Sequence, residues 1–217
     1  MTRRSSILFP LVFALFLSLA PLAGPGAGSG RALAAGAGEG YLGPGLIFLG
    51  AVSLMDQSLY ETVQEASTPA RRAFFDTATY LGDGWTALAV TLGLRGSDPQ
   101  TADMVGSAFL RAGLAVNALK LVISRPRPTE DPSACGENRW SIGVCGSFPS
   151  GHSATAFSVA HVLAHQYPQH KGLFYALAVL AAWSRVEVQA HWPSDVVAGA
   201  IIGLLAADSV IKQASGW

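Results

Sequence analysis

Recurrent apolar segments are the feature that most constrains the fold of this 217-residue chain. Half of the residues are hydrophobic and only 13% are charged, against about a quarter charged in a typical soluble domain. The segments are rich in Ala, Leu and Gly and have helical lengths, and no alternating strand pattern competes with them. They cover residues 41–55, 84–94, 104–123, 152–165, 172–184 and 195–211. The pattern predicts an all-α fold, a bundle of about six helices, with one long polar loop from roughly 124 to 149.

The same segments bear on whether the bundle lies in a membrane. A spanning helix needs about 20 mainly apolar residues. The segment 104–123 is long enough but carries Arg111 and Lys120, and the last segment has Asp at both ends. Residues 172–183 are apolar on every face, which is unusual on a soluble surface. We therefore expect a membrane-embedded bundle whose internal charges face a shared interior, with a soluble, tightly packed bundle as the alternative.

The N-terminus has the pattern of an export sequence. Two arginines precede an apolar run over residues 7–20, and Ala32-Leu33-Ala34 offers a small-residue cleavage site. A secretory signal peptide and an uncleaved membrane anchor both fit this pattern, and both predict an exported or inserted chain. The expected boundaries are 1–34 for the signal peptide or anchor, 35–43 for a linker and 44–217 for a single domain.

Charge and cysteine content bear on three features of the chain: nucleic-acid binding, disulfide formation and metal binding. Acidic and basic residues balance at 14 each, so nothing favours nucleic acid as a partner. Cys135 and Cys145 are separated by nine residues. In an oxidising compartment they could close a short disulfide loop, and two free thiols are the alternative. A metal site is disfavoured because this pair lacks a second pair of ligands.

Two polar clusters frame the long loop. Lys120 lies at the C-terminal end of an apolar helix and Arg127 on the loop that follows. On their own, such cations are also explained by the helix dipole, which stabilises positive charge near a helix C-terminus. In Pro149-Ser150-Gly151-His152, Ser150 is a natural N-cap and Gly151 allows close approach of a ligand to the backbone. A helix start of this kind is either only a cap or an anion site with His152 in its first turn.

A third cluster contains Ser184-Arg185 and, further on, His191 followed four residues later by Asp195. Such a pair could be a nucleophile or base with its orienting carboxylate. Alternatively, Ser194 or Asp195 only caps the last helix. Taken together, the three clusters combine three cations, a helix N-terminus and two histidines. This set suits a tetrahedral oxyanion with a charge of about −2.

In this order, the clusters resemble the signature of the type 2 phosphatidic acid phosphatase superfamily, which also contains bacterial acid phosphatases and vanadium haloperoxidases. That signature is K-x6-RP, then PSGH, then SR-x5-H-x3-D, and the chain matches it across residues 120–195. The SRPRP segment holds two Arg-Pro pairs, and the six-residue spacing from Lys120 selects Arg127 over Arg125.

The resemblance implies a helical core with the site at one end, and a role for each matched residue. His191 attacks phosphorus, Asp195 holds its imidazole, and His152 protonates the leaving oxygen. The resemblance assigns phosphoryl binding to Lys120, Arg127, Ser150, Gly151 and Arg185. It implies no metal and no other cofactor, because fixed cations supply the electrostatic stabilisation.

The expected function is metal-independent hydrolysis of a phosphomonoester or pyrophosphate through a phosphohistidine. The apolar helices favour a lipid substrate such as phosphatidate, phosphatidylglycerol phosphate, a polyprenyl diphosphate or lipid A. The expected location is the cell envelope, in the inner membrane with a periplasm-facing site. The alternatives are a soluble periplasmic acid phosphatase, a vanadium-dependent haloperoxidase, and a non-catalytic protein, whose mark would be the loss of a catalytic residue.

Overall fold

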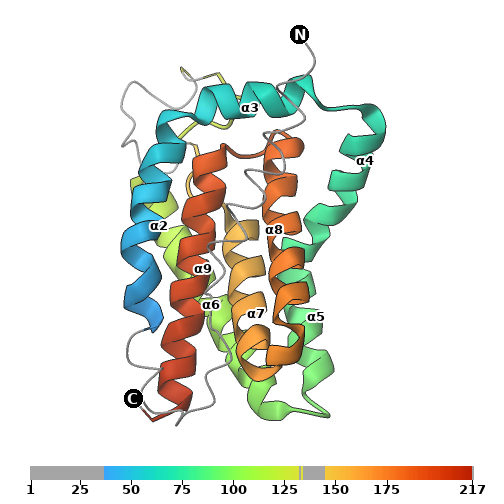
Figure 1. Ribbon diagram of the computed structural model, residues 1–217, viewed down its shortest axis with the longest axis vertical. Coiled ribbons are helices and arrows are strands. Elements are labelled where there is room, and N and C mark those ends of the chain that lie inside the picture. The colour runs from blue at the N-terminus through green and yellow to red at the C-terminus, as the bar shows by residue number, and fades with distance from the viewer. Residues whose placement is uncertain (1–36, 132, 134–144, 217) are drawn as a thin grey trace.

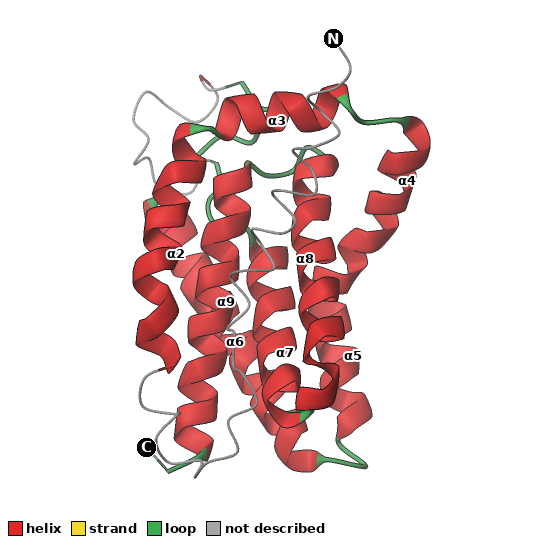
Figure 2. Cartoon of the chain, in the orientation of Figure 1, coloured by secondary structure: helices red, strands yellow, loops and turns green. Residues whose placement is uncertain are grey.

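A computed structural model describes residues 37–131, 133 and 145–216, without the side chains of residues 37–41. The predicted signal peptide or anchor lies outside these residues. The described part is helical apart from loops and one isolated bridge between Arg125 and Gly146, which confirms the all-α prediction (Figure 2). The helices are α2 (Ala37–Leu54), α3 (Asp56–Glu65), α4 (Pro69–Ala78), α5 (Gly84–Leu94), α6 (Pro99–Val122), α7 (Gly151–Gln166), α8 (Lys171–Glu187) and α9 (Pro193–Ala214).

All six predicted segments form helices, and α3 and α4 are two more that the apolar runs did not indicate. Both are polar helices with only a narrow buried stripe, which is Asp56 and Val63 in α3. The start of α4 does carry a sequence signal, because Thr68 caps it and Pro69 occupies its first position. Helix α2 begins at Ala37, so part of the stretch predicted as a linker is helical.

Four long helices either end or begin at the same end of the bundle (Figure 1). Helices α6 and α8 run toward one end of the bundle, and α7 and α9 run away from it. The C-terminal ends of the first pair therefore lie near the N-terminal ends of the second, and α3 lies across this end. Helix α7 packs against α6, α8 and α9, and most of its residues are buried. This end of the bundle is where the three polar clusters of the sequence meet.

Two glycines of α9 allow its close packing against α7. A Cβ at Gly199 would lie 2.3 Å from the Ser150 carbonyl oxygen, and one at Gly203 would lie 2.4 Å from that of Ala154. Two hydrogen bonds also join the two helices. The Ser150 N–H donates to the Asp195 carbonyl (2.9 Å), and Ser153 Oγ donates to the Val196 carbonyl (2.6 Å). The glycines thus set the start of α7 against the first turn of α9.

Substituting Gly199 with alanine is therefore expected to destabilise the fold by about 1–3 kcal/mol, because the new methyl group collides with backbone. In detergent, the midpoint temperature of thermal unfolding should fall by several degrees relative to the wild type. The matched control is Gly113→Ala in α6, where no described atom beyond the adjoining residues and local helix backbone lies within 4 Å of the added Cβ. That variant should be neutral or slightly stabilising. Equal unfolding temperatures for the two variants would contradict this account of the α7–α9 contact.

Much of the outer surface of α2, α5 and α6 is apolar, as expected for helices in lipid. Within the described residues, α6 and α9 are long and apolar enough to cross a membrane. A third span results if α2 and α3, which are bent by 68° where they meet, count as one. Only 22% of the apolar window of α6 is buried, so most of its side chains face outward. Exposed large apolar residues include Leu46, Ile47, Leu88, Leu92, Leu110, Leu114, Leu121 and Leu173.

Candidate active site

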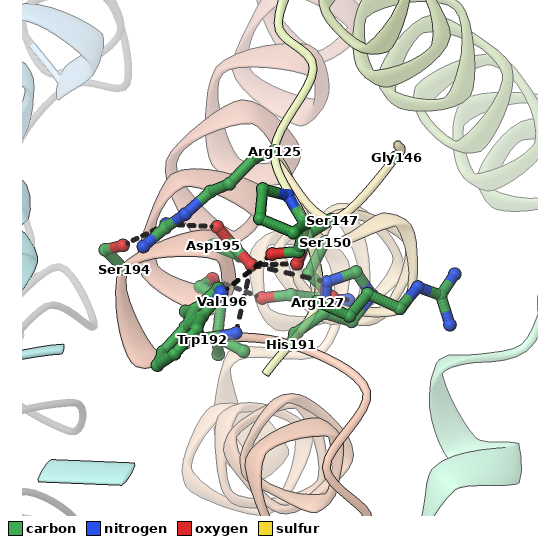
Figure 3. A network of polar contacts seen from close by, with 12 residues as sticks. Arg125, Arg127, Gly146, Ser147, Ser150, His191, Trp192, Ser194, Asp195 and Val196 are labelled. Carbon is green, nitrogen blue, oxygen red and sulfur yellow. Dashed lines mark hydrogen bonds and ion pairs between the residues drawn. The ribbon is translucent and has the colours of Figure 1, made fainter. Parts of the chain in front are cut away.

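The three clusters converge at the end of the bundle where α6 and α8 finish (Figures 1 and 3). Four helices, the loop between α6 and α7 and the loop between α8 and α9 contribute the residues. Lys120 lies in the last turn of α6, Arg185 in the last turn of α8, and Asp195 in the first turn of α9. Ser150 is the N-cap of α7, and Gly151 and His152 are its first two residues. His191 lies in the α8–α9 loop.

The start of α7 is held as a capped helix terminus. Ser150 has an extended backbone, and its side-chain oxygen accepts a hydrogen bond from the Ser153 N–H at 3.4 Å. The turn Thr79–Gly82 packs against this start, because a Cβ at Gly82 would lie 2.8 Å from the His152 carbonyl oxygen. First-turn N–H groups have no partner within their helix, and the dipole makes this end positive. The terminus is therefore suited to bind an anion.

A tight turn after α8 brings His191 next to Arg185. The Arg185 carbonyl accepts hydrogen bonds from the N–H groups of Ala190 (2.9 Å) and His191 (3.1 Å). Gln189, the residue before Ala190, has a φ of 61°, in the left-handed region where helices commonly end. The chain thus reverses within four residues, and the histidine is placed over the end of α8.

Asp195 is fixed in an orientation that faces the His191 ring. Its Oδ2 accepts hydrogen bonds from Ser147 Oγ (2.5 Å) and the Trp192 N–H (3.0 Å), and lies 3.7 Å from His191 Nδ1. That separation exceeds a hydrogen bond, and among the described residues Nδ1 is buried without another partner. His191 is 3% exposed and Asp195 fully buried. A small rotation of the imidazole would bring Nδ1 within hydrogen-bonding distance of Oδ2, with Nε2 on the far side of the ring from Asp195.

The surroundings favour the neutral form of both histidines by lowering their pKa. Burial is the main cause that lowers the pKa of His191; Lys120 and Arg185 act in the same direction, and Asp195 opposes them. Burial, followed by the charge of Arg185, lowers the pKa of His152 to about 4. A neutral His191 retains the lone pair that attack requires. A bound phosphate would offset the cations and favour the protonated form of His152, as a general acid needs.

Three cations lie within electrostatic range of one another here, namely Lys120, Arg127 and Arg185. The Lys120 ammonium donates to the Gly146 carbonyl, and Arg185 Nη1 donates to Thr79 Oγ1. Arg185 Nε is buried and has no hydrogen-bond partner among the described residues. An anion bound between these groups would relieve the mutual repulsion of the cations and give Arg185 Nε an acceptor.

The two arginines of the SRPRP segment have different surroundings. Arg127 pairs with Glu130, with 3.8 Å between Nε and Oε1, and its guanidinium extends away from Asp195 (Figure 3). Arg125 instead contacts Asp195 directly, with 2.6 Å between Nη1 and Oδ1. Sequence spacing selected only Arg127, so Arg125 was missed, as was Ser147. The doubled Arg-Pro pair was the one sequence signal for Arg125.

Two sequence predictions remain predictions. Cys145 is 6% exposed, and Cys135 lies outside the described residues, so the disulfide between them is untested. Within the described part of the chain, no group of three or more His, Cys, Asp or Glu side chains could hold a metal ion. Metal independence needs an experiment of its own.

Known proteins share parts of the sequence. A lipid A 1-phosphatase from Rhizobium etli is 38% identical over 95 residues, which are 42% of this chain and 41% of that protein. An acid phosphatase from Zymomonas mobilis is 33% identical over 107 residues, which are 48% of this chain and 40% of that protein. The chain thus spans about two fifths of the length of these curated relatives.

Solved structures and a family match complete the comparison. LpxE from Aquifex aeolicus superposes with a TM-score of 0.63 at 28% identity, covering 73% of this chain and 95% of that structure. The transmembrane PAP2-type phosphatidylglycerolphosphate phosphatase from Bacillus subtilis gives a TM-score of 0.60 at 25% identity, covering 95% of this chain and 96% of that structure. Residues 102–215, more than half of the chain and inclusive of all three clusters, match the PAP2 superfamily, and the chain belongs to this superfamily.

Proposed function

We propose that the protein is a metal-independent phosphatase that hydrolyses a lipid phosphomonoester or pyrophosphate through a phosphohistidine intermediate. The observation that carries this proposal is the pair of His191 and Asp195, 3.7 Å apart, beside three cations and the start of α7. A histidine backed by a buried carboxylate is an activated nucleophile, and the cations with the free N–H groups suit phosphoryl oxygens.

The proposed reaction has two steps at one phosphorus atom. His191 Nε2 attacks and forms a P–N bond while the bond to the leaving oxygen breaks, and His152 gives that oxygen a proton. Asp195 stabilises the positive charge that develops on the His191 ring. A water molecule then attacks the phosphohistidine, His152 takes its proton, and the P–N bond breaks to release phosphate. Lys120, Arg127 and Arg185 balance the charge on the phosphoryl oxygens throughout.

The apolar surface supports a lipid substrate at a membrane. The outward face of α6 is apolar along a helix that is long enough to span a bilayer, and the site lies at the end of that helix. A lipid whose chains lie along the apolar face of α6 would place its phosphate near the end of that helix, where the site lies. Relatives named as lipid A 1-phosphatase and phosphatidylglycerolphosphate phosphatase also favour a lipid phosphate. The export pattern of the N-terminus favours the inner membrane with the site facing the periplasm.

A second candidate is an acid phosphatase of broad specificity, favoured by the similarity to the Zymomonas mobilis acid phosphatase. The two candidates differ in substrate range and in the fraction that carries the activity. A lipid phosphatase should be found with membranes and prefer lipid phosphates. A soluble acid phosphatase should be released on cell lysis and hydrolyse small phosphate esters equally well.

Phosphate release should therefore be measured on membrane and soluble fractions separately, with lipid A, phosphatidate, phosphatidylglycerol phosphate, a polyprenyl diphosphate and p-nitrophenyl phosphate. We expect activity in the membrane fraction, highest with one of the lipids, and unchanged by EDTA. Activity confined to the soluble fraction would favour the second candidate. Strong inhibition by EDTA that added metal reverses would contradict the metal-free reaction.

A further inference from the structure

Arg125 lies at the centre of a polar network behind the His191–Asp195 pair (Figure 3). Its Nη1 donates to Asp195 Oδ1 at 2.6 Å and to Ser194 Oγ at 2.8 Å. Its Nη2 donates to Asp56 Oδ2 at 2.6 Å, and its guanidinium lies 5.4 Å from the ring centre of Trp192. Both terminal nitrogens are therefore already held by protein oxygens.

Asp56 closes this network from α3. It is the first residue of that helix and only 6% exposed. Its Oδ1 accepts the Ser194 N–H at 2.8 Å, and its Oδ2 accepts Ser194 Oγ. Asp56 thus caps the start of α9 from another helix, because first-turn N–H groups lack a partner within their own helix. The network joins the long loop, α3 and the first turn of α9.

The two carboxylate oxygens of Asp195 have different partners in this network. Oδ1 is bound to Arg125, whereas Oδ2 faces His191 Nδ1. A fully buried carboxylate is costly unless it is paired, so the arginine offsets the cost of burying Asp195 and holds it in place. The planar fork of an arginine can bind both carboxylates at once in a fixed geometry, which the single ammonium of a lysine does not reproduce.

We propose that Arg125 is a positioning residue of the phosphatase site, which acts through Asp195 and couples its orientation to α3 through Asp56. This inference rests on the proposed function. Arg125 differs in this from Arg127, for which the proposed role is to bind phosphate. Loss of Arg125 should therefore impair turnover more than substrate binding, since the phosphate-binding cations are unchanged.

The test is steady-state kinetics on Arg125→Lys in detergent with the best lipid substrate from the screen. We expect kcat to fall by about 10- to 100-fold with KM within about threefold, because the His191–Asp195 geometry is loosened. The matched control is Arg71→Lys. The Arg71 and Arg125 side chains are both 26% exposed, and each pairs with a fully buried carboxylate, Glu187 for Arg71 and Asp195 for Arg125. Among the described residues Glu187 makes no hydrogen bond or ion pair with His191, so this control should keep kcat within about twofold even if it unfolds earlier.

Further variants separate the outcomes. Arg125→Gln should lose more turnover than Arg125→Lys, and if it does not fold, the lysine variant alone decides. A kcat for Arg125→Lys of at least half the wild-type value would overturn the inference, as would a loss expressed only in KM. If the wild type hydrolyses lipid, His191→Ala does not, and Arg125→Lys is fully active, only this inference fails. A wild type without phosphatase activity, or an active His191→Ala, would overturn the proposed function itself.

Discussion

Replacing His191 with alanine is expected to lower kcat for phosphate release by about 10⁴-fold or more, because the nucleophile of the first step is removed. The reason lies in the placement of the ring. The turn through Gln189 sets His191 over the end of α8, and Asp195 faces its Nδ1 from a fixed position. The measurement is phosphate release from p-nitrophenyl phosphate and from the best lipid substrate.

The control for this variant is His170→Ala. His170 is an exposed histidine on the short turn Pro168–His170, and its ring contacts Phe174. We expect that control to keep wild-type turnover. Size-exclusion chromatography and thermal unfolding should show that His191→Ala remains folded. Turnover of folded His191→Ala within about tenfold of wild type would remove His191 from the role of nucleophile.

Substituting Arg185 with alanine is the second large effect that we expect, a loss of about 10²- to 10³-fold in kcat/KM. Arg185 carries a buried Nε without a partner among the described residues, and its charge lies within electrostatic range of His191 and Lys120. Such a donor stabilises the charge that builds on the phosphoryl oxygens in the transition state. Removal of this side chain should therefore lower kcat as well as raise KM.

Arg111→Ala provides the comparison for Arg185. Arg111 lies on α6, is partly exposed, and donates to Ser209 and Gln213 of α9. We expect kcat/KM of this control to stay within about threefold of wild type, because a surface hydrogen bond contributes little to the site. Equal losses in the two variants would mean that Arg185 acts through general stability and not on the phosphate.

Most of the helices could be predicted because their apolar runs are long. The exceptions, α3 and α4, bury only a few side chains each, and a search for apolar runs does not detect a narrow stripe. Asp56 begins α3, so overlooking this helix also hid the residue that caps α9 from outside. The Thr68-Pro69 pair was the available signal for α4.

The matched site residues were predictable because they stand in short clusters at fixed spacing. The structure brings Lys120, Arg185 and His191 to one end of the bundle. The supporting residues follow no local pattern. Asp56 contacts Ser194 across 138 positions of the sequence, and Ser147 reaches Asp195 across 48. Contacts of this kind depend on how α3, the long loop and α9 pack together.

Detection of the phosphoenzyme is the measurement that tests the central claim most directly. Wild-type protein mixed with a substrate labelled in the transferred phosphate should be quenched in alkali, which preserves a P–N bond, and digested for mass spectrometry. The account predicts a phosphate that is stable to alkali, lost in acid and located on His191, with none on that peptide in the His191→Ala variant. A phosphate trapped on any other residue, or an active wild type whose His191 carries no phosphate at any quench time, would contradict it.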